Sequence, residues 1–474
     1  MLVPPPRVNP WVVGFAVLAA LTVLATQLLR PPVVGLADNG DYQRVMAPAG
    51  FDHSTDVHDE RYFSFLRTTY RILPLGSTPG GYLSSEAVLA LAARSVAAVF
   101  GARTVFDLRV LAGIHIVLYV LAIGLMLRAT RDLEPATQLL AAVLLVFFFT
   151  DVGYIGPFNS FYSQTASLLF LMLTAALAAE AVTRREFSGA RLFLFYLCAA
   201  AFVTSKPQEA IQGPLLALLG LRLAGVGLRG ASKRPAVWLA IALCALSVWY
   251  GRRTPMTLRE AALYQVVFYE VLPHSPDPAA DAAALGLDPA WIRYSGTDAF
   301  EPGTPLNDAA FRVRFLGSVG FRKVAAFYLR HPGRASERLE RISKKIWSLR
   351  PSYGNLERSA EHPTKTLTDR DSAWSRWRLR VLGAFPIAAL AALYAGNAAV
   401  ALATWRTSSV RGRRFRETVV AAVLMSATAF LVCILTNAPP DYSRVFYTAE
   451  ALCDLLLVAD VAWLAQVLAR RARA

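Results

Sequence analysis

The chain has 474 residues, of which 55% are hydrophobic and only 17% charged, and its formal net charge is +16. This composition excludes a soluble domain with one membrane anchor and indicates an integral membrane protein. The positive charge does not indicate nucleic-acid binding, because no soluble basic domain or recognition module accompanies it.

Apolar segments that are long enough to cross a bilayer, or nearly so, recur along the whole chain, about ten in number. They lie at residues 11–29, 110–127, 137–150, 164–182, 191–205, 210–224, 236–250, 381–404, 418–437 and 448–468. The short pair around Lys206-Pro207 forms either two short spans or a re-entrant hairpin, and in both cases the chain returns to the side it left. The sequence therefore predicts an all-α polytopic membrane protein.

Basic residues set the predicted orientation. With a cytoplasmic N-terminus, the inner connections carry most of the arginines near the spans, whereas the short outer connections are mainly acidic. Both termini are therefore expected in the cytoplasm. Three parts follow: an N-terminal transmembrane module at 1–250, an extracytoplasmic and mainly helical segment at 251–380, and C-terminal transmembrane helices at 381–474.

The first outer loop, 31–109, opens with an acidic motif directly after the first span, Asp38-Asn39-Gly40-Asp41-Tyr42-Gln43-Arg44. A turn at Asn-Gly would let the carboxyl groups of Asp38 and Asp41 converge on one space. A carboxylate there could act as general base toward a hydroxyl or as a ligand for a divalent cation, Mg²⁺ or Mn²⁺. The alternative is ordinary turn chemistry.

Later in this loop, Ser84 or Ser85 is a candidate N-cap for a helix that ends near Phe100. Glu86 and Arg94 interrupt its apolar pattern and it is short for a span, so we expect an interfacial helix. The segment His53–Glu60 resembles a loose metal cluster, but its spacing does not support one.

The third span ends in a stretch rich in glycine, aromatic, amide and hydroxyl groups, from Asp151 to Gln164. Aromatic rings and side chains that bond several hydroxyls are typical of carbohydrate sites. An aromatic belt at the membrane interface explains the rings equally well, but it explains Asn159 and Gln164 less well.

Two cations lie where a charge is costly unless it is paired or faces a wet cavity. Lys206 lies between two short apolar segments and could bind a phosphate, snorkel, or pair with Glu209. Arg444 precedes the last span and could hold a phosphate bidentately or pair with Asp441.

The segment 251–380 has its clearest element at 319–349, a helix broken at His331-Pro332-Gly333. Arg334 and Arg338 lie on one face of its second half, and Leu339 and Ile342 lie on another. This pattern favours an amphipathic basic helix at the membrane surface over a binding site.

Taken together, the chain resembles membrane glycosyltransferases of the type C fold (GT-C). Within that group it is similar to bacterial proteins of the WsfD-like glycan biosynthesis hexose transferase family. The resemblance rests on short motifs, namely Asn39–Arg44, Gly153-Tyr154-Ile155, Phe158–Tyr162, Ser205–Gln208 and Asp441–Arg444.

This resemblance implies a GT-C-like bundle with an acidic catalytic base in the first outer loop and a polyprenyl-phosphate sugar donor whose tail lies in the membrane. The spacing Asp-x-x-Asp departs from the adjacent or one-apart carboxylates of many such enzymes. Whether Asp41 or Asp38 is the base, and whether a metal is required, therefore stays open.

The resulting hypothesis is an inverting hexosyltransferase at the outer face of a bacterial cytoplasmic (inner) membrane, with a cell-envelope glycan as acceptor and membrane lipids as surroundings. Asp41 or Asp38 would deprotonate the acceptor. The donor phosphate would contact Lys206, Arg444, Arg334 and Arg338. The sugar or acceptor pocket would include Tyr42, Arg44, Tyr154, Asn159, Tyr162, Gln164, Gln208 and Asp441.

Two other classes remain as alternatives. A transporter or flippase of a lipid-linked saccharide would line a passage with the same cations, although the sequence has no corresponding halves of the kind that many transporters carry. A non-catalytic scaffold would leave the buried charges unexplained.

Overall fold

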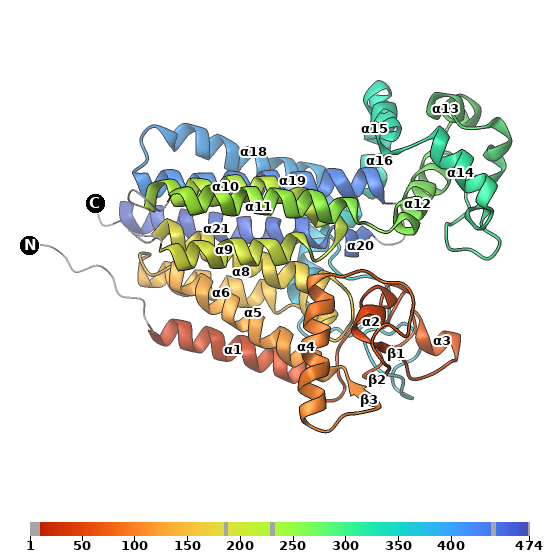
Figure 1. The fold of residues 1–474 in the computed structure, drawn as a ribbon. Coiled ribbons are helices and arrows are strands. Elements are labelled where there is room, and N and C mark those ends of the chain that lie inside the picture. Colours follow the sequence, from red (N-terminus) through yellow and green to blue (C-terminus); the bar gives the residue numbers. More distant parts are fainter. Residues whose placement is uncertain (1–9, 184–187, 228–232, 438–441, 473–474) are drawn as a thin grey trace, which may run out of the picture.

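The computed structural model describes residues 10–183, 188–227, 233–437 and 442–472. Long helices run side by side in one bundle, and the remaining elements cover one end of it (Figure 1). Strands are few and short. The chain is an all-α polytopic membrane protein, so the fold class predicted from the sequence is confirmed.

Each of the ten predicted apolar segments forms a helix of the bundle. These are α1 (Pro10–Leu28), α5 (Arg109–Ala129), α6 (Pro135–Phe149), α8 (Gln164–Thr183), α9 (Gly189–Val203), α10 (Gly213–Gly227), α11 (Lys233–Arg252), α18 (Pro386–Trp405), α19 (Val410–Thr436) and α21 (Tyr447–Arg471). Within the described residues, seven helices are long and apolar enough to cross a membrane. The number rises to eight if α6 and its bent continuation, α7 (Val152–Ile155) with η1 (Gly156–Phe158), form one span. The predicted number of ten is therefore approximate.

The bundle has two unlike ends. Helix α1 begins and helix α21 ends at the same one, which we call the terminal end (Figure 1). The opposite end, which we call the loop end, carries residues 29–108 and 253–385. Both predicted outer regions thus lie together, opposite the chain ends. Which side of the membrane each end faces stays a prediction.

The first of these regions folds around a small aromatic core. Its elements are α2 (Gln43–Ala49), β1 (Phe51–His53), α3 (His58–Arg61), β2 (Thr69–Ile72), α4 (Ser85–Val99) and β3 (Val105–Asp107). The strands form an antiparallel sheet in the order β1-β2-β3, with Phe51 opposite Ile72 and Tyr70 opposite Phe106. The rings of Phe51, Tyr70 and Phe106 pack against Phe161, which joins this region to the bundle.

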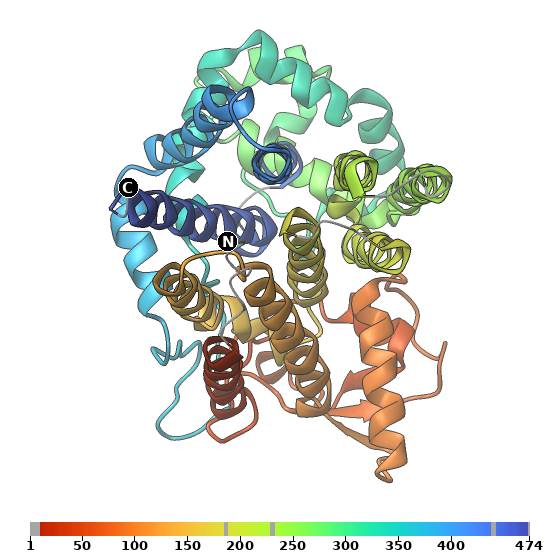
Figure 2. The same cartoon turned by 90° about the vertical axis from the view of Figure 1, so that its left-hand side faces the viewer.

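Helix α4 begins where the sequence predicts it. The Ser84 hydroxyl accepts a hydrogen bond from the backbone N–H of Ala87 at 3.1 Å. The helix lies crosswise over the loop end rather than along the bundle, as an interfacial helix would (Figures 1 and 2). Glu86 does not face solvent: it is fully buried and lies 3.1 Å from Nε2 of His115 in α5.

The second region packs around its own apolar core and projects beyond the bundle (Figure 1). Its elements are α12 (Met256–Tyr264), the π-helical η4 (Gln265–Val271), α13 (Pro278–Leu285), η5 (Pro289–Tyr294), η6 (Pro305–Asn307), α14 (Ala309–Ser318), α15 (Phe321–Arg330), α16 (Pro332–Ser343) and η7 (Lys344–Trp347). The predicted break is confirmed, since α15 ends at Arg330 and α16 starts at Pro332.

An extended segment then returns to the first region. The Gly35 N–H donates to the carbonyl of Asn355 (2.9 Å), and the Ala37 N–H donates to that of Gly354 (2.8 Å). Gly354 passes so close to the loop that a Cβ there would lie 2.1 Å from the carbonyl oxygen of Ser64. The chain continues through α17 (Ala373–Val381) and η8 (Leu382–Ala384), and α20 (Tyr442–Val445) later precedes α21.

Candidate active site

The acidic motif forms a tight turn that leads into α2. The Asp38 carboxylate oxygen Oδ1 accepts from the backbone N–H of Gly40 (2.7 Å) and of Tyr42 (3.0 Å). Gly40 has a φ of 97°, a left-handed conformation that glycine adopts at little cost. This local bonding explains why Asp-Asn-Gly-Asp turns here.

Asp41, in the same turn, forms ion pairs with two arginines. Its oxygen Oδ1 lies 2.6 Å from Nη2 of Arg44, and its oxygen Oδ2 accepts from Nη2 of Arg444. Its side chain is 17% exposed. Burial by itself would raise the pKa of Asp41, but the charges of Arg44 and Arg444 outweigh it and bring the pKa below the ordinary value of 3.8. Asp41 is therefore ionised at neutral pH.

Arg444 reaches the loop from α20, just before the last bundle helix. Its guanidinium donates from Nη1 to Oδ1 of Asn39 at 2.6 Å and lies 4.1 Å from the ring centre of Tyr162. The hydroxyl of Tyr162 donates to the carbonyl of Ala37 (2.8 Å) and accepts from the N–H of Asn39 (2.8 Å). The predicted residues Asp41, Arg444 and Tyr162 thus meet in one place.

Lys206 completes this cluster of cations. It caps η2 (Pro207–Gln212), and its charge interacts with those of Glu209, Arg444 and Asp41. Within the described residues, no carboxylate lies at ion-pair distance from its ammonium group. Gln208 ties η2 to α20 by donating from Nε2 to the carbonyl of Val445 (3.3 Å), which holds Lys206 and Arg444 near each other.

The expected convergence of the two aspartates is wrong. The second oxygen of Asp38, Oδ2, lies 3.2 Å from Nε2 of His53, and both side chains are almost fully buried. Asp41 instead faces Arg44 and Arg444. The reason is local: the N–H groups of Gly40 and Tyr42 fix Asp38 inside the turn, so that Asp41 emerges on the other side.

A divalent cation does not fit these carboxylates as they stand. Asp38 already accepts two backbone hydrogen bonds and contacts His53, and both oxygens of Asp41 are taken by guanidinium groups. In the part of the chain that the structure describes, no group of three or more His, Cys, Asp or Glu side chains is placed to hold a metal ion.

Two of the predicted pocket residues, Tyr42 and Asn159, stabilise the turn and do not line a pocket beside Asp41. Tyr42 is buried, donates to the carbonyl of Leu36 and packs edge-on against Tyr162. Asn159 is fully buried and donates from Nδ2 to the carbonyls of Leu28 and Val34, both at 2.8 Å. These contacts fix the chain where it leaves α1. Neither side chain faces Asp41.

Other predicted residues lie further away. Tyr154 donates to Asp454 (2.6 Å) in a buried cluster with Arg378. Gln164 is buried and lines, with Arg444, a cavity of only about 10 Å³, too small for a sugar in this conformation. Asp441 lies outside the described residues.

The two arginines of α16 belong to a different cluster. Arg334 pairs with Asp281 (2.9 Å) and Glu337 (2.7 Å), and Arg338 donates to the hydroxyl of Tyr328 (2.8 Å) and lies 3.7 Å from Glu270. Asp41 is paired with neither of them. Ion pairs with Asp281, Glu337 and Glu270 hold both arginines inside the second region, and their contact with a donor phosphate stays a prediction.

Two tyrosines of the site escaped the sequence reasoning. Tyr353, from the returning segment, accepts from Nδ2 of Asn39 at 3.3 Å and its ring centre lies 5.9 Å from the guanidinium of Arg444. The backbone N–H of Tyr82 donates to the carbonyl of Arg44 (3.2 Å). The signal for Tyr353 was the turn-like Ser352-Tyr353-Gly354-Asn355 inside a long polar stretch.

Comparisons with known proteins give one family. A family model described as the YfdI N-terminal transmembrane domain matches residues 6–474. No curated protein matches the chain. This description differs from the WsfD-like family, so that part of the resemblance stays a prediction.

Among solved structures, the chain is similar to the archaeal oligosaccharyltransferase AglB from Archaeoglobus fulgidus, solved in complex with an inhibitory peptide and a dolichol-phosphate. The identity is 16% and the TM-score 0.39, over 95% of the present chain and 50% of that one. The present chain thus spans about half the length of AglB.

Proposed function

We propose that the chain, which belongs to the YfdI N-terminal transmembrane domain family, is an inverting membrane glycosyltransferase. It moves a hexose from a polyprenyl-phosphate donor to a cell-envelope glycan at the outer face of a bacterial inner membrane, with both termini in the cytoplasm. The observation that carries this proposal is the partly exposed Asp41 carboxylate, ionised between Arg44 and Arg444 at the loop end of an apolar bundle, with Lys206 close by.

Asp41 is the proposed general base. Its carboxylate takes the proton from an acceptor hydroxyl, whose oxygen forms a bond to the anomeric carbon of the donor sugar. The bond between that carbon and the phosphate oxygen breaks, and the lipid phosphate leaves with the electron pair. Attack from the face opposite the phosphate inverts the configuration.

The cations around Asp41 match the charge of the leaving group. Arg44, Arg444 and Lys206 outnumber the Asp41 carboxylate, and a guanidinium can hold a phosphate bidentately. Cations placed where negative charge develops stabilise the transition state. Every group named in this step belongs to the chain itself.

The pairing also suggests how the base is activated. A carboxylate held by two arginines is a weak base because its proton-free form is stabilised. A bound donor phosphate competes for Arg44 and Arg444, and each guanidinium that turns to the phosphate weakens its hold on Asp41. The basicity of Asp41 then rises only when the donor is present.

The test is a transfer assay in proteoliposomes with polyprenyl-phosphate hexoses as donors and a cell-envelope glycan extract as acceptor. Asp41→Asn should lose activity by about 10²–10⁴-fold, the usual contribution of a general base. The matched control is Asp59→Asn, in the same loop, whose side chain is 93% exposed; it should keep full activity.

Full activity of Asp41→Asn would refute the assignment of the base. A wild-type protein that transfers no sugar from any donor, but moves lipid-linked saccharides across the same vesicles, is instead a flippase. A parallel arm with a chelator asks whether a divalent cation takes part.

A further inference from the structure

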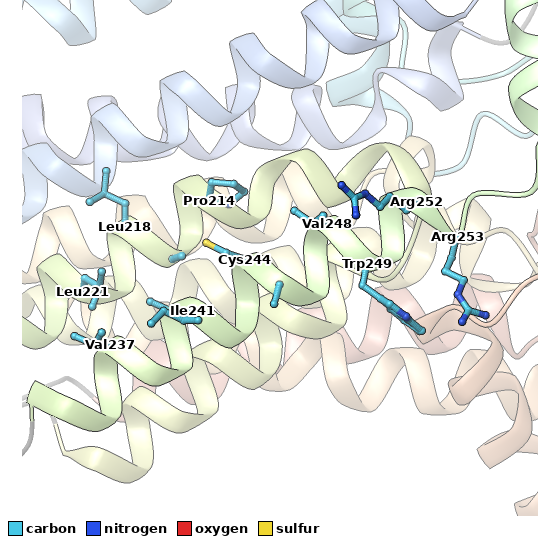
Figure 3. Close-up of a pocket in the computed structure, with 13 residues that line it drawn as sticks. Pro214, Leu218, Leu221, Val237, Ile241, Cys244, Val248, Trp249, Arg252 and Arg253 are labelled. Carbon is cyan, nitrogen blue, oxygen red and sulfur yellow. The ribbon is translucent and has the colours of Figure 1, made fainter.

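A large groove lies on the outside of the bundle, lined mainly by exposed side chains. It runs between α10 and α11, has a volume of about 970 Å³, and opens outward (Figure 3). Helix α10 contributes Pro214, Leu218 and Leu221, and helix α11 contributes Val237, Ile241 and Val248. All the residues that line it are apolar except two, Arg252 and Arg253, so its walls are suited to hydrocarbon.

The packing of the two helices explains the hollow. At the loop end they touch, because a Cβ on Gly213 would lie 1.8 Å from Oγ of Ser247. Further along, the small side chains of Ala217, Ala240 and Ala245 line the groove between larger neighbours. From Val237 to Trp249 the groove follows α11 for about 18 Å at the helical rise per residue.

Among the described residues that line the groove, the two arginines lie together at one end. Arg252 and Arg253 end the line of apolar side chains where α11 reaches the loop end, as Figure 3 shows. Both are exposed, and within the described residues neither guanidinium has a carboxylate partner at ion-pair distance. The Arg253 guanidinium lies 5.4 Å from the ring centre of Trp249. An apolar groove that ends in two unneutralised cations complements a hydrocarbon chain with an anionic head.

Contacts connect this charged end to the candidate active site. A Cβ on Gly251, the residue before Arg252, would lie 3.8 Å from the Cβ of Ala210 in η2. Helix α11 also packs against η2, the element that Lys206 caps. A head group at Arg252 and Arg253 would therefore stand beside the elements that carry the proposed catalytic residues.

We propose that the α10–α11 groove binds the isoprenoid tail of the polyprenyl-phosphate donor, and that Arg252 and Arg253 bind its phosphate as it approaches Asp41. The identity of this occupant rests on the proposed function. A groove between one pair of helices suits a single chain, whereas a bilayer phospholipid carries two. The cations that line the groove, Arg252 and Arg253, would place the head of the lipid toward the loop end.

The first experiment locates the lipid without any turnover. A long-chain polyprenyl phosphate with a photoreactive group in its tail is cross-linked to the full chain in proteoliposomes, and the adducts are mapped by peptide mass spectrometry. Adducts concentrated on the groove faces of α10 and α11 support the proposal. Adducts spread evenly over the outward faces of other bundle helices would overturn it.

The second experiment measures binding of the same polyprenyl phosphate to variants by native mass spectrometry. Ala245→Trp fills the groove and should weaken binding about tenfold, a change of about 1.4 kcal/mol. Its matched control is Ala242→Trp, exposed on the same helix but outside the groove, which should bind as the wild type does. Equal affinities for the two tryptophan variants would refute the groove as the tail site.

Geranyl phosphate has the same phosphate head and a short tail, so its binding separates the contribution of the head from that of the tail. The double variant Arg252→Gln/Arg253→Gln should bind both lipids about tenfold more weakly. Ala245→Trp should weaken only the long one. Arg259→Gln, an exposed arginine of α12, is the control for lost charge and should change neither. Unchanged geranyl phosphate binding in the double variant would refute the head-group assignment.

The cross-linking and binding measurements are independent of the proposed transferase reaction, and the transfer assay separates the two proposals. If Ala245→Trp keeps the wild-type KM for a long-chain donor in the transfer assay, the groove assignment fails while the glycosyltransferase stands. If the lipid binds in the groove and no sugar is transferred by the wild type, the groove stands and the proposed reaction fails.

Discussion

The ion pair between Asp41 and Arg444 joins positions 403 residues apart, and its energetic coupling can be measured. Arg444→Gln removes a buried guanidinium and leaves Asp41 with Arg44 alone, 2.6 Å away. Removing one partner of a buried pair costs roughly 3–5 kcal/mol when the remaining charge has no other partner. Because Arg44 stays and Asp41 is 17% exposed, we expect a loss nearer about 2 kcal/mol in the free energy of unfolding.

A double-mutant cycle isolates the pair from these side effects. Asp41→Asn, Arg444→Gln and the double variant are unfolded in mixed detergent micelles and followed by circular dichroism. We expect a coupling energy of about 1–2 kcal/mol, within the range for residues in direct contact. The matched control is Asp56–Arg61 in the same region, whose Asp56 side chain is 79% exposed; its coupling should stay below about 1 kcal/mol. Equal coupling energies for the two pairs would refute the structural role of Asp41–Arg444.

The pH dependence of this coupling has a definite sign. Since the pKa of Asp41 in the folded chain lies below its ordinary value of 3.8, the pair contributes stability above that value. The contribution is lost as the pH falls through the folded pKa. The coupling energy should therefore be the same at about pH 7 and about pH 5 and decrease below about pH 4. A decrease between neutral pH and about pH 5 would contradict the pairing.

Three further substitutions test the support of the loop. Gly354→Ala places a Cβ 2.1 Å from the carbonyl oxygen of Ser64. We therefore expect a loss of about 1–3 kcal/mol in the free energy of unfolding. Unchanged stability would contradict this close approach. Tyr162→Phe removes a hydroxyl that is hydrogen-bonded to three groups of the loop. The free energy of unfolding should fall by about 1–3 kcal/mol, and the transfer rate should fall with it. A variant with the stability and transfer rate of the wild type would show that this hydroxyl does not hold the loop. Asp38→Asn keeps the oxygen that accepts the two backbone hydrogen bonds and changes only the contact with His53, so the transfer rate of this variant should match that of the wild type. A loss of transfer rate as large as that of Asp41→Asn would make Asp38 the base.

The sequence predicted the parts of this molecule that depend on local patterns. Every apolar segment became a helix, Ser84 capped α4, and the break at His331-Pro332 separated α15 from α16. Each of these features is determined by side chains within a few residues of one another. The three strands were missed because β1 and β3 have only three residues each, too few to show an alternating pattern.

Partners far apart in the sequence were predicted less well. Tyr353 reaches Asn39 because the segment around Gly354 pairs with residues 35–37. No local sequence pattern predicts this pairing. Arg334 was grouped with Lys206 because both are cations expected on the outer side. The structure pairs it with Asp281 instead, in a region with its own core.

The grouping of Asp41, Lys206 and Arg444 was nevertheless predictable, and the reason is energetic. A charge inside the hydrocarbon layer is costly, so polar residues of a membrane bundle gather where helices end. Because the helices alternate in direction, connections separated by hundreds of residues share one end, and polar connections of that end are neighbours in space. Which neighbours pair is decided by the backbone: Asp38, bonded to the N–H groups of Gly40 and Tyr42, turns the loop so that Asp41 faces Arg444. Topology thus brings the charged residues together, and one turn decides which carboxylate faces the cations.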